Sequence, residues 1–334
     1  MGIRQRERLI LPHWAVALVV PPLIVLFAGY ALQDLFAWQE PIADIQTKAV
    51  SARYEAIART RVLGSMLPFS VAATLIAAWF VREFLWLLGP RSRARLWIAI
   101  VIFGVAAAIQ LAPQLMGDSP ADAGVMGKDF FSTALSKAQA TSDGMNWAVS
   151  ITGEKSVPVA ILHVLVFVFS IFMILGAGAA IIGTASCVAR PPRNRPRKTR
   201  LFYHDLQRAR IDGYLYASAF LLVTGLFFMD CAFRWPAAYA ADRALFEQQA
   251  DALVLYNGIL YSMVLVAYYV PAALLMRRFS YRTGGAVAPS PARAESGSTL
   301  AERVSPSRLV KAFLALIAPA VAGVLSQLME GAGL

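Results

Sequence analysis

Long apolar runs alternate with shorter polar segments along most of the chain. A helix that crosses the roughly 30 Å hydrocarbon core of a membrane needs about 20 apolar residues. The runs that reach this length cover residues 9–32, 62–88, 96–115, 157–188, 211–233 and 252–276. The pattern therefore predicts an all-α, polytopic membrane helix bundle with six transmembrane helices, formed by residues 1–282.

The first run follows the short basic segment MGIRQRER. Its apolar stretch is about twice as long as the core of a cleavable signal peptide, and no convincing small-residue cleavage site follows it. We therefore predict that it is retained in the membrane as a signal anchor.

The segments between the runs predict helical extensions on the outer side of the membrane. TKAVSARYEAIARTR and AAYAADRALFEQQAD contain neither Gly nor Pro and lead directly into the second and sixth runs. The segment 116–156 opens with a turn-rich stretch and then offers a shorter amphipathic helix, FFSTALSKAQA.

The last fifty residues change character. Residues 283–304 are rich in Gly, Pro and Ser, which predicts a flexible cytoplasmic linker. Ser305-Pro306 then resembles a helix N-terminus, and the apolar segment that follows continues to Met329 with Pro319 in its middle. Its length is marginal for a seventh span, so we expect an amphipathic or re-entrant helix in residues 305–334, lying on the inner surface or docked against the bundle; a seventh span is the alternative.

Composition and charge sharpen this membrane assignment. The 334 residues are 58% hydrophobic and only 15% charged, with a mean hydropathy of +0.58, which leaves no soluble stretch long enough for a large catalytic domain. If the N-terminus is cytoplasmic, 22 of the 31 Lys and Arg residues lie on the inner side and nine on the outer side. The positive-inside rule therefore predicts a bacterial inner-membrane protein with both termini in the cytoplasm.

Common catalytic motifs are absent from the sequence. It contains no HExxH, GxSxG, Walker A or GxGxxG motif, and Cys187 and Cys231 belong to no metal-binding spacing. The three histidines lie at different expected depths, which disfavours a haem held by paired imidazoles. We therefore expect no enzyme, no cofactor and no metal.

One layer of polar residues carries the sharpest functional signal. Gln110, His163, Asp230 and Asn257 each lie about five residues, or roughly 7.5 Å, inside the outer end of a predicted span. Such residues usually face a bundle interior or a water-filled cavity, which predicts a pore or ion-binding layer. In the alternative interpretation, Arg234 neutralises Asp230 from one turn away and the other polar groups bond between helices.

Other residues suggest helix packing and gating. Pro271 and Pro319 each interrupt an apolar helix and are candidates for gating kinks or for static kinks. Small residues in ILGAGAAIIGTAS and around Gly104 allow close helix approach, either within the chain or between subunits.

Basic residues concentrate in two predicted cytoplasmic loops and attract anionic lipid headgroups. A more specific interpretation is a pocket for a phosphorylated ligand, because guanidinium groups match phosphate geometry. The candidate residues are Arg91, Arg93, Arg95, Arg193, Arg195, Arg197, Lys198 and Arg200.

These features favour an oligomeric pore or channel gated by a cytoplasmic signal. An ion-coupled or solute transporter is the first alternative, and a non-conducting sensor or assembly subunit that binds a periplasmic partner is the second. The expected partners are anionic lipids, further copies of the chain, and a cytoplasmic anionic ligand or sensor protein; nucleic acid is not expected.

Overall fold

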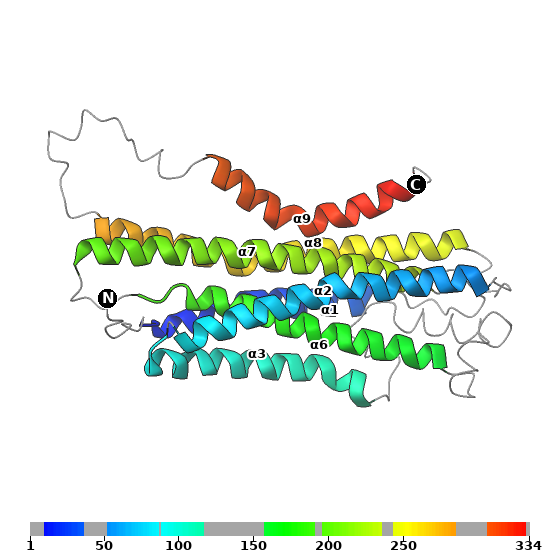
Figure 1. Ribbon diagram of the computed structural model, residues 1–334, viewed down its shortest axis with the longest axis horizontal. Coiled ribbons are helices and arrows are strands. Elements are labelled where there is room, and N and C mark those ends of the chain that lie inside the picture. The colour runs from blue at the N-terminus through cyan, green and yellow to red at the C-terminus, as the bar shows by residue number, and fades with distance from the viewer. Residues whose placement is uncertain are drawn as a thin grey trace, which may run out of the picture.

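A computed structural model describes residues 10–36, 52–86, 88–116, 157–190, 196–235, 243–284 and 306–331 of the chain. Its long helices lie side by side along one axis (Figure 1). In chain order the elements are the 3-10 helix η1 (His13–Val19) and the α-helices α1 (Val20–Phe36), α2 (Ala52–Trp86), α3 (Pro90–Met116), α6 (Val157–Ser186), α7 (Arg197–Arg234), α8 (Arg243–Gly284) and α9 (Pro306–Gly331).

Five helices of the described part are long and apolar enough to cross a membrane, which indicates a multi-pass membrane protein. They cover Ala56–Trp86, Pro90–Ile109, Phe167–Ser186, Phe202–Arg234 and Ala250–Met276. These helices correspond to the second to sixth predicted spans.

The first predicted span corresponds to η1 and α1, whose described apolar stretch His13–Gly29 is shorter than the five candidate spans. Pro21 and Pro22 lie in the first turn of α1, where the missing backbone N–H groups cost no helical hydrogen bond. Further along, Gly29 lets α1 approach α8, because a Cβ at this position would lie 2.3 Å from Leu260. Tyr256 of α8 also donates a hydrogen bond to the Gly29 carbonyl at 2.7 Å. The sixth span stays a prediction.

Two of the predicted outer extensions are helical. Helix α2 begins at Ala52 and α8 at Arg243, in both cases before the candidate span of that helix. The amphipathic helix predicted within 116–156 lies outside the described residues.

One predicted boundary is wrong. Residues 197–210 were expected to belong to a basic cytoplasmic loop, but α7 is continuous from Arg197. The cause is local, because this stretch contains no Gly or Pro and its Arg, Lys, Leu and Gln residues favour helix regardless of their charge.

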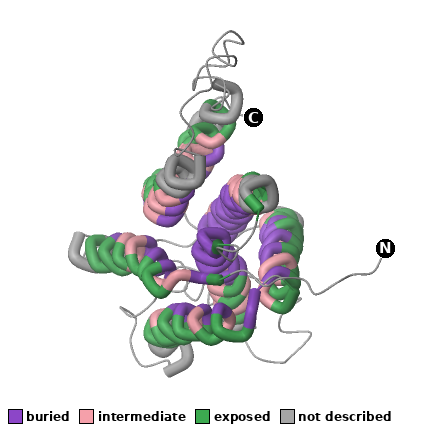
Figure 2. Tube along the Cα trace, turned by 90° about the vertical axis from the view of Figure 1, so that its left-hand side faces the viewer, coloured by how far each residue is buried: buried purple, intermediate pink, exposed green. Residues whose placement is uncertain are grey.

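The middle of the bundle is apolar. Figure 2, which looks along the bundle, shows the buried residues on the inward faces of the helices. The rings of Phe69 in α2, Phe169 in α6 and Phe228 in α7 stack on one another, with centroids 4.5 Å, 4.7 Å and 6.5 Å apart. We call these three side chains the phenylalanine layer. They fill the space where α2, α6 and α7 meet.

Glycines in α6 allow this close packing. A Cβ at Gly176 would lie 3.1 Å from the Cα of Ala73 in α2, and one at Gly178 would lie 2.5 Å from the ring of Phe103 in α3. The small residues of α6 therefore pack within the chain, which is the first of the two interpretations given above. Gly104 of α3 differs, because no atom lies within 4 Å of a Cβ built there.

The C-terminal segment forms the predicted helix, α9. It contacts both α7 and α8 and lies along their length, with a bend near its middle (Figure 1). The structure thus shows the docked arrangement rather than a helix lying across one end of the bundle.

Candidate functional site

Among the described residues, buried or half-buried charged side chains form two clusters, one toward each end of the bundle. We call the end where α2 connects to α3 and α6 connects to α7 the basic end, since the basic segments flank these connections. The Glu83 cluster lies toward the basic end and the Arg234 cluster lies toward the opposite end.

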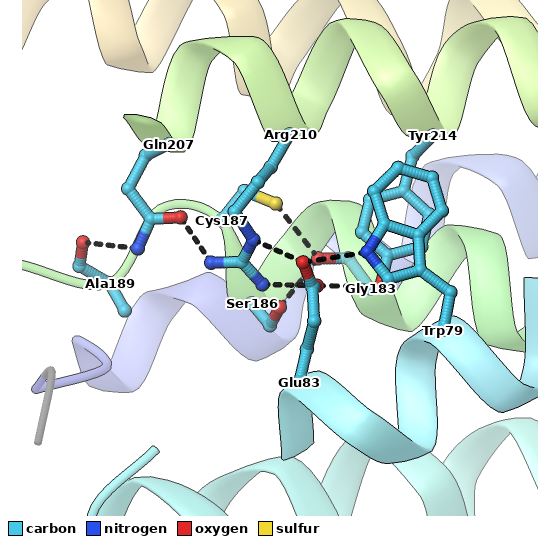
Figure 3. A network of polar contacts seen from close by, with 9 residues as sticks. All are labelled: Trp79, Glu83, Gly183, Ser186, Cys187, Ala189, Gln207, Arg210 and Tyr214. Atoms are coloured by element: carbon cyan, nitrogen blue, oxygen red, sulfur yellow. Dashed lines mark hydrogen bonds and ion pairs between the residues drawn. The ribbon is translucent and has the colours of Figure 1, made fainter. Parts of the chain in front are cut away.

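The Glu83 cluster centres on an ion pair between α2 and α7 (Figure 3). Arg210 donates from Nε to Oε1 of Glu83 at 2.5 Å and from Nη2 to Oε2 of the same carboxylate. The side chains of Arg210 and Glu83 are only 7% and 8% exposed. This is a buried, two-point guanidinium–carboxylate contact, the strongest geometry that such a pair adopts.

Three further side chains complete the hydrogen bonds of this pair. Trp79 donates from Nε1 to Oε1 of Glu83 at 2.9 Å, and Tyr214 donates from its hydroxyl to Oε2 at 2.7 Å. Gln207 accepts a hydrogen bond from Nη1 of Arg210. A buried ion pair costs several kcal/mol per ion in desolvation unless such contacts compensate it, and here both carboxylate oxygens accept two hydrogen bonds.

Helical spacing places these groups. Trp79 and Glu83 are four residues apart on α2, while Gln207, Arg210 and Tyr214 follow one another at intervals of three and four on α7. Residues at these spacings share one helix face. The indole of Trp79 also stacks on the Tyr214 ring, with centroids 4.5 Å apart and planes 7° from parallel.

Glycine makes room for both rings. A Cβ at Gly183 of α6 would lie 2.4 Å from the Tyr214 ring, and one at Gly213 would lie 2.5 Å from the Trp79 indole. The cluster thus depends on close approach by α6 as well as on the pair itself.

The end of α6 supports the cluster through its backbone. Gln207 donates from Nε2 to the Ala189 carbonyl at 3.5 Å. Ser186 and Cys187 both donate to the Gly183 carbonyl, at 2.6 Å and 3.3 Å. The Gln207 bond ties the segment after α6 to the face of α7 that carries Arg210, whereas the Ser186 and Cys187 bonds close the last turn of α6.

The sequence interpretation missed the Glu83 cluster. Neither Glu83 nor Arg210 was among the candidate residues that the sequence offered. The available signal was a single carboxylate close to the end of an apolar helix, because a charge placed there needs a partner.

The Arg234 cluster joins α7 to α8. Arg234 donates from Nε to Asp230 at 2.8 Å on its own helix and from Nη2 to Asp251 of α8 at 2.5 Å. The three side chains are 16% to 20% exposed. The pairing of Asp230 with Arg234 was predicted from their spacing, whereas the bond to Asp251 was not.

The predicted polar layer is described only in part. Asn257 is buried and donates from Nδ2 to the Leu253 carbonyl of its own helix at 2.9 Å. Gln110 lies on α3 and His163 on α6, but their side chains are outside the described part of the structure. Of this layer, the structure therefore joins Asp230 to Arg234, its neighbour one turn away.

The two proline candidates lie within helices. Pro271 is half-buried inside α8, which continues as a helix to Gly284. Pro319 is buried where α9 meets α8, and it lies near the middle of α9 (Pro306–Gly331).

Arginines between α2 and α3 make contacts within the chain. Arg93 donates from Nε to the Leu88 carbonyl at 3.1 Å, and Arg95 donates from Nη1 to the Leu11 carbonyl. Ser92 accepts the Leu11 amide at 2.9 Å. The bonds of Ser92 and Arg95 to Leu11 fasten the segment before η1 to the start of α3.

The remaining predicted basic residues are less engaged or lie outside the description. Arg91 is exposed. Arg193 and Arg195 fall outside the described residues. Arg197, Lys198 and Arg200 lie in the first turn of α7, where the side chains are not described.

Within the described ranges, no group of three or more His, Cys, Asp or Glu side chains is placed to hold a metal ion. Comparisons with protein-family models, with curated proteins and with solved structures found no match to this chain. Its chemistry must therefore be inferred from the geometry alone, and both charged clusters act as contacts between helices.

Proposed function

We propose that the protein is a membrane subunit of the sensor or assembly type that does not conduct through its own bundle. In this proposal the protein resides in a bacterial inner membrane. Its basic end and N-terminus face the cytoplasm, as the positive-inside rule favours, and anionic lipids surround the arginines of that end.

The observation that carries the proposal is the phenylalanine layer. The rings of Phe69, Phe169 and Phe228 lie in contact between the Glu83 cluster and the Arg234 cluster. Ion pathways through membranes are lined by carbonyl oxygens or charged rings, and hydrophobic constrictions along them close by dewetting. The three rings lie in contact with one another, so they supply neither a polar lining nor an open constriction between α2, α6 and α7.

Two further features suit a subunit that transmits a signal across the membrane or assembles with a partner protein. Helices α2 and α8 extend beyond their candidate spans at the end opposite the basic end, where they offer helical surfaces to a partner. The Glu83 pair ties α2 to α7 at the basic end, so a movement of one helix at the partner side is carried to the other side of the membrane.

A pore formed between copies of the chain is the second candidate. The observation that favours it is the outward face of α3, where Gly104 is open and Val101 and Val105 are more than half exposed. Small residues on an outward face allow two helices to approach closely. An ion-coupled transporter has less support, because Arg234 already neutralises Asp230.

The experiment purifies the full-length protein from its native membrane in mild detergent and measures the stoichiometry of any co-purifying protein. The same preparation is reconstituted into liposomes that contain an ion-sensitive dye. We expect a stoichiometric partner and no flux above that of empty liposomes. Flux that rises with the amount of protein, without any partner, would favour the pore between copies and overturn this proposal.

A further inference from the structure

The contact between α9 and α8 fixes the direction and the depth of α9. A Cβ at Gly258 of α8 would lie 2.7 Å from the Pro319 carbonyl oxygen, and one at Gly323 of α9 would lie 3.1 Å from the Cα of Leu255. Residue numbers therefore fall along α8 as they rise along α9. The two helices run antiparallel, with backbones in close contact through glycine.

The bend of α9 lies in the part of the helix that contacts α8. A proline inside a helix removes one backbone hydrogen bond and displaces the neighbouring carbonyl. The amide of Ala320, the residue after Pro319, donates to Oγ of Ser262 on α8 at 3.1 Å. A side chain of α8 thus satisfies backbone that the proline exposes, which is the condition for such a kink inside a membrane.

The depth of this contact places α9 within the membrane. Leu255, Gly258 and Ser262 all lie inside the candidate span Ala250–Met276 of α8. With a rise of about 1.5 Å per residue in both helices, the start of α9 is about level with Pro271. The end of α9 then reaches past the beginning of the α8 span, at the end opposite the basic end.

The outward face of α9 matches lipid. Val310, Phe313, Leu314, Val321, Val324 and Leu325 are each more than 40% exposed. The apolar stretch Val310–Leu325 is about 24 Å long at the helical rise, somewhat less than the roughly 30 Å of hydrocarbon. Lys311 lies toward the basic end, and helical side chains lean toward the helix N-terminus, so its ammonium group can reach the interface.

We infer that α9 is a further membrane-spanning helix that carries the C-terminus to the end opposite the basic end, with acyl chains covering its outer face. This inference reverses the sequence-based expectation that both termini lie on the same side. It does not depend on the proposed function, since it concerns only the path of the chain.

Cysteine labelling of the full-length protein tests the inference. One variant carries Gly333→Cys near the C-terminus and a matched variant carries Ser298→Cys in the segment before α9. Intact spheroplasts are treated with a maleimide that does not cross membranes. The wild-type protein serves as the control, because any labelling of it comes from the native Cys187 and Cys231. We expect Gly333→Cys to react in intact spheroplasts and Ser298→Cys to react only after the membrane is opened. Labelling of both variants only after opening would overturn the inference.

A second measurement tests the contact between α9 and α8 directly. In the Leu255→Cys, Gly323→Cys double variant, with a protease site inserted between residues 285 and 305, oxidation should form a disulfide that holds α9 to the rest of the chain after cleavage. The same variant with only Gly323→Cys is the control. Release of α9 to an equal extent in both, or cross-linked dimers instead of an intramolecular bond, would contradict docking within one chain.

Discussion

The Glu83 cluster and the Arg234 cluster use the same chemistry in different surroundings. Both pair a guanidinium with carboxylates, and both join α7 to a neighbouring helix. In the Glu83 cluster the charges are less than 10% exposed and four donors surround one carboxylate. In the Arg234 cluster one guanidinium is shared by two carboxylates, and each side chain keeps about twice that exposure.

This difference in exposure indicates which of the two clusters contributes most to the stability of the fold. A buried pair that loses one partner leaves an unpaired charge away from water, which costs about 3–5 kcal/mol, whereas exposed pairs contribute about 0–1 kcal/mol. The Glu83 cluster should therefore behave as a clamp between α2 and α7. The Arg234 cluster should behave as an adjustable contact.

The largest effect is expected at Arg210. Arg210→Met keeps most of the side-chain volume but leaves the buried Glu83 carboxylate without its cation, so we expect the unfolding free energy to fall by about 3–5 kcal/mol. Equilibrium unfolding in mixed detergent micelles measures this change.

The Glu83→Gln, Arg210→Met double variant sharpens the same test. Because both charges are gone, we expect its loss of stability to be smaller than the sum of the two single losses, with a coupling of about 1–3 kcal/mol. Additive losses would show that the two side chains do not act as a pair.

A second prediction concerns the room that α6 leaves for the cluster. Gly183→Leu places a side chain where the Tyr214 ring already lies, and overpacking of this kind costs about 1–3 kcal/mol. Gly104→Leu is the matched control, because no atom lies within 4 Å of a Cβ there. Thermal unfolding of the two variants should separate them, and equal melting temperatures would contradict the packing described here.

The hydrogen bond between α9 and α8 involves no charged group, and we expect its loss to cost an amount between the losses at Arg210 and at Arg234. Ser262→Ala removes the acceptor of the Ala320 amide, and we expect a loss of about 1 kcal/mol. Unfolding in the same micelles measures it. A loss as large as that of Arg210→Met would mean that α9, rather than the Glu83 pair, dominates the stability of the bundle.

The smallest effect is expected at Arg234. Arg234→Met should cost clearly less than Arg210→Met, because the side chains of this cluster are about twice as exposed as those of the Glu83 pair and water screens part of their charge. The loss should shrink further in high salt, since added ions screen charges near the surface. If Arg234→Met lowers the unfolding free energy as much as Arg210→Met does, and the loss does not depend on salt, the proposed difference between the two clusters is wrong.

The sequence predicted features that depend on local composition. The apolar runs around α2, α3, α6, α7 and α8 were recognised because length and hydrophobicity alone define a membrane helix. The bond between Asp230 and Arg234 was recognised because residues four apart on one helix always share a face.

Features that depend on how helices rotate against one another were missed. Glu83 meets Arg210 only because the polar face of α2 turns toward α7, and Asp251 meets Arg234 only because α8 returns beside α7. The same limit affects Asn257, whose depth was estimated from the sequence but whose amide bonds to its own helix. Counting residues along a helix gives the depth of a side chain in the membrane, whereas only the packed structure shows which neighbouring helix that side chain faces.

The central claim is that the phenylalanine layer closes the interior of one chain. Purified wild-type protein in planar bilayers tests it most directly, with the Phe228→Asn variant, which puts a polar group into the layer, recorded under the same voltage and salt. We predict no current steps for wild type at any voltage that the bilayer tolerates. Reproducible unitary currents from wild type whose size changes in Phe228→Asn would contradict the claim, because they would place the conducting path through this layer.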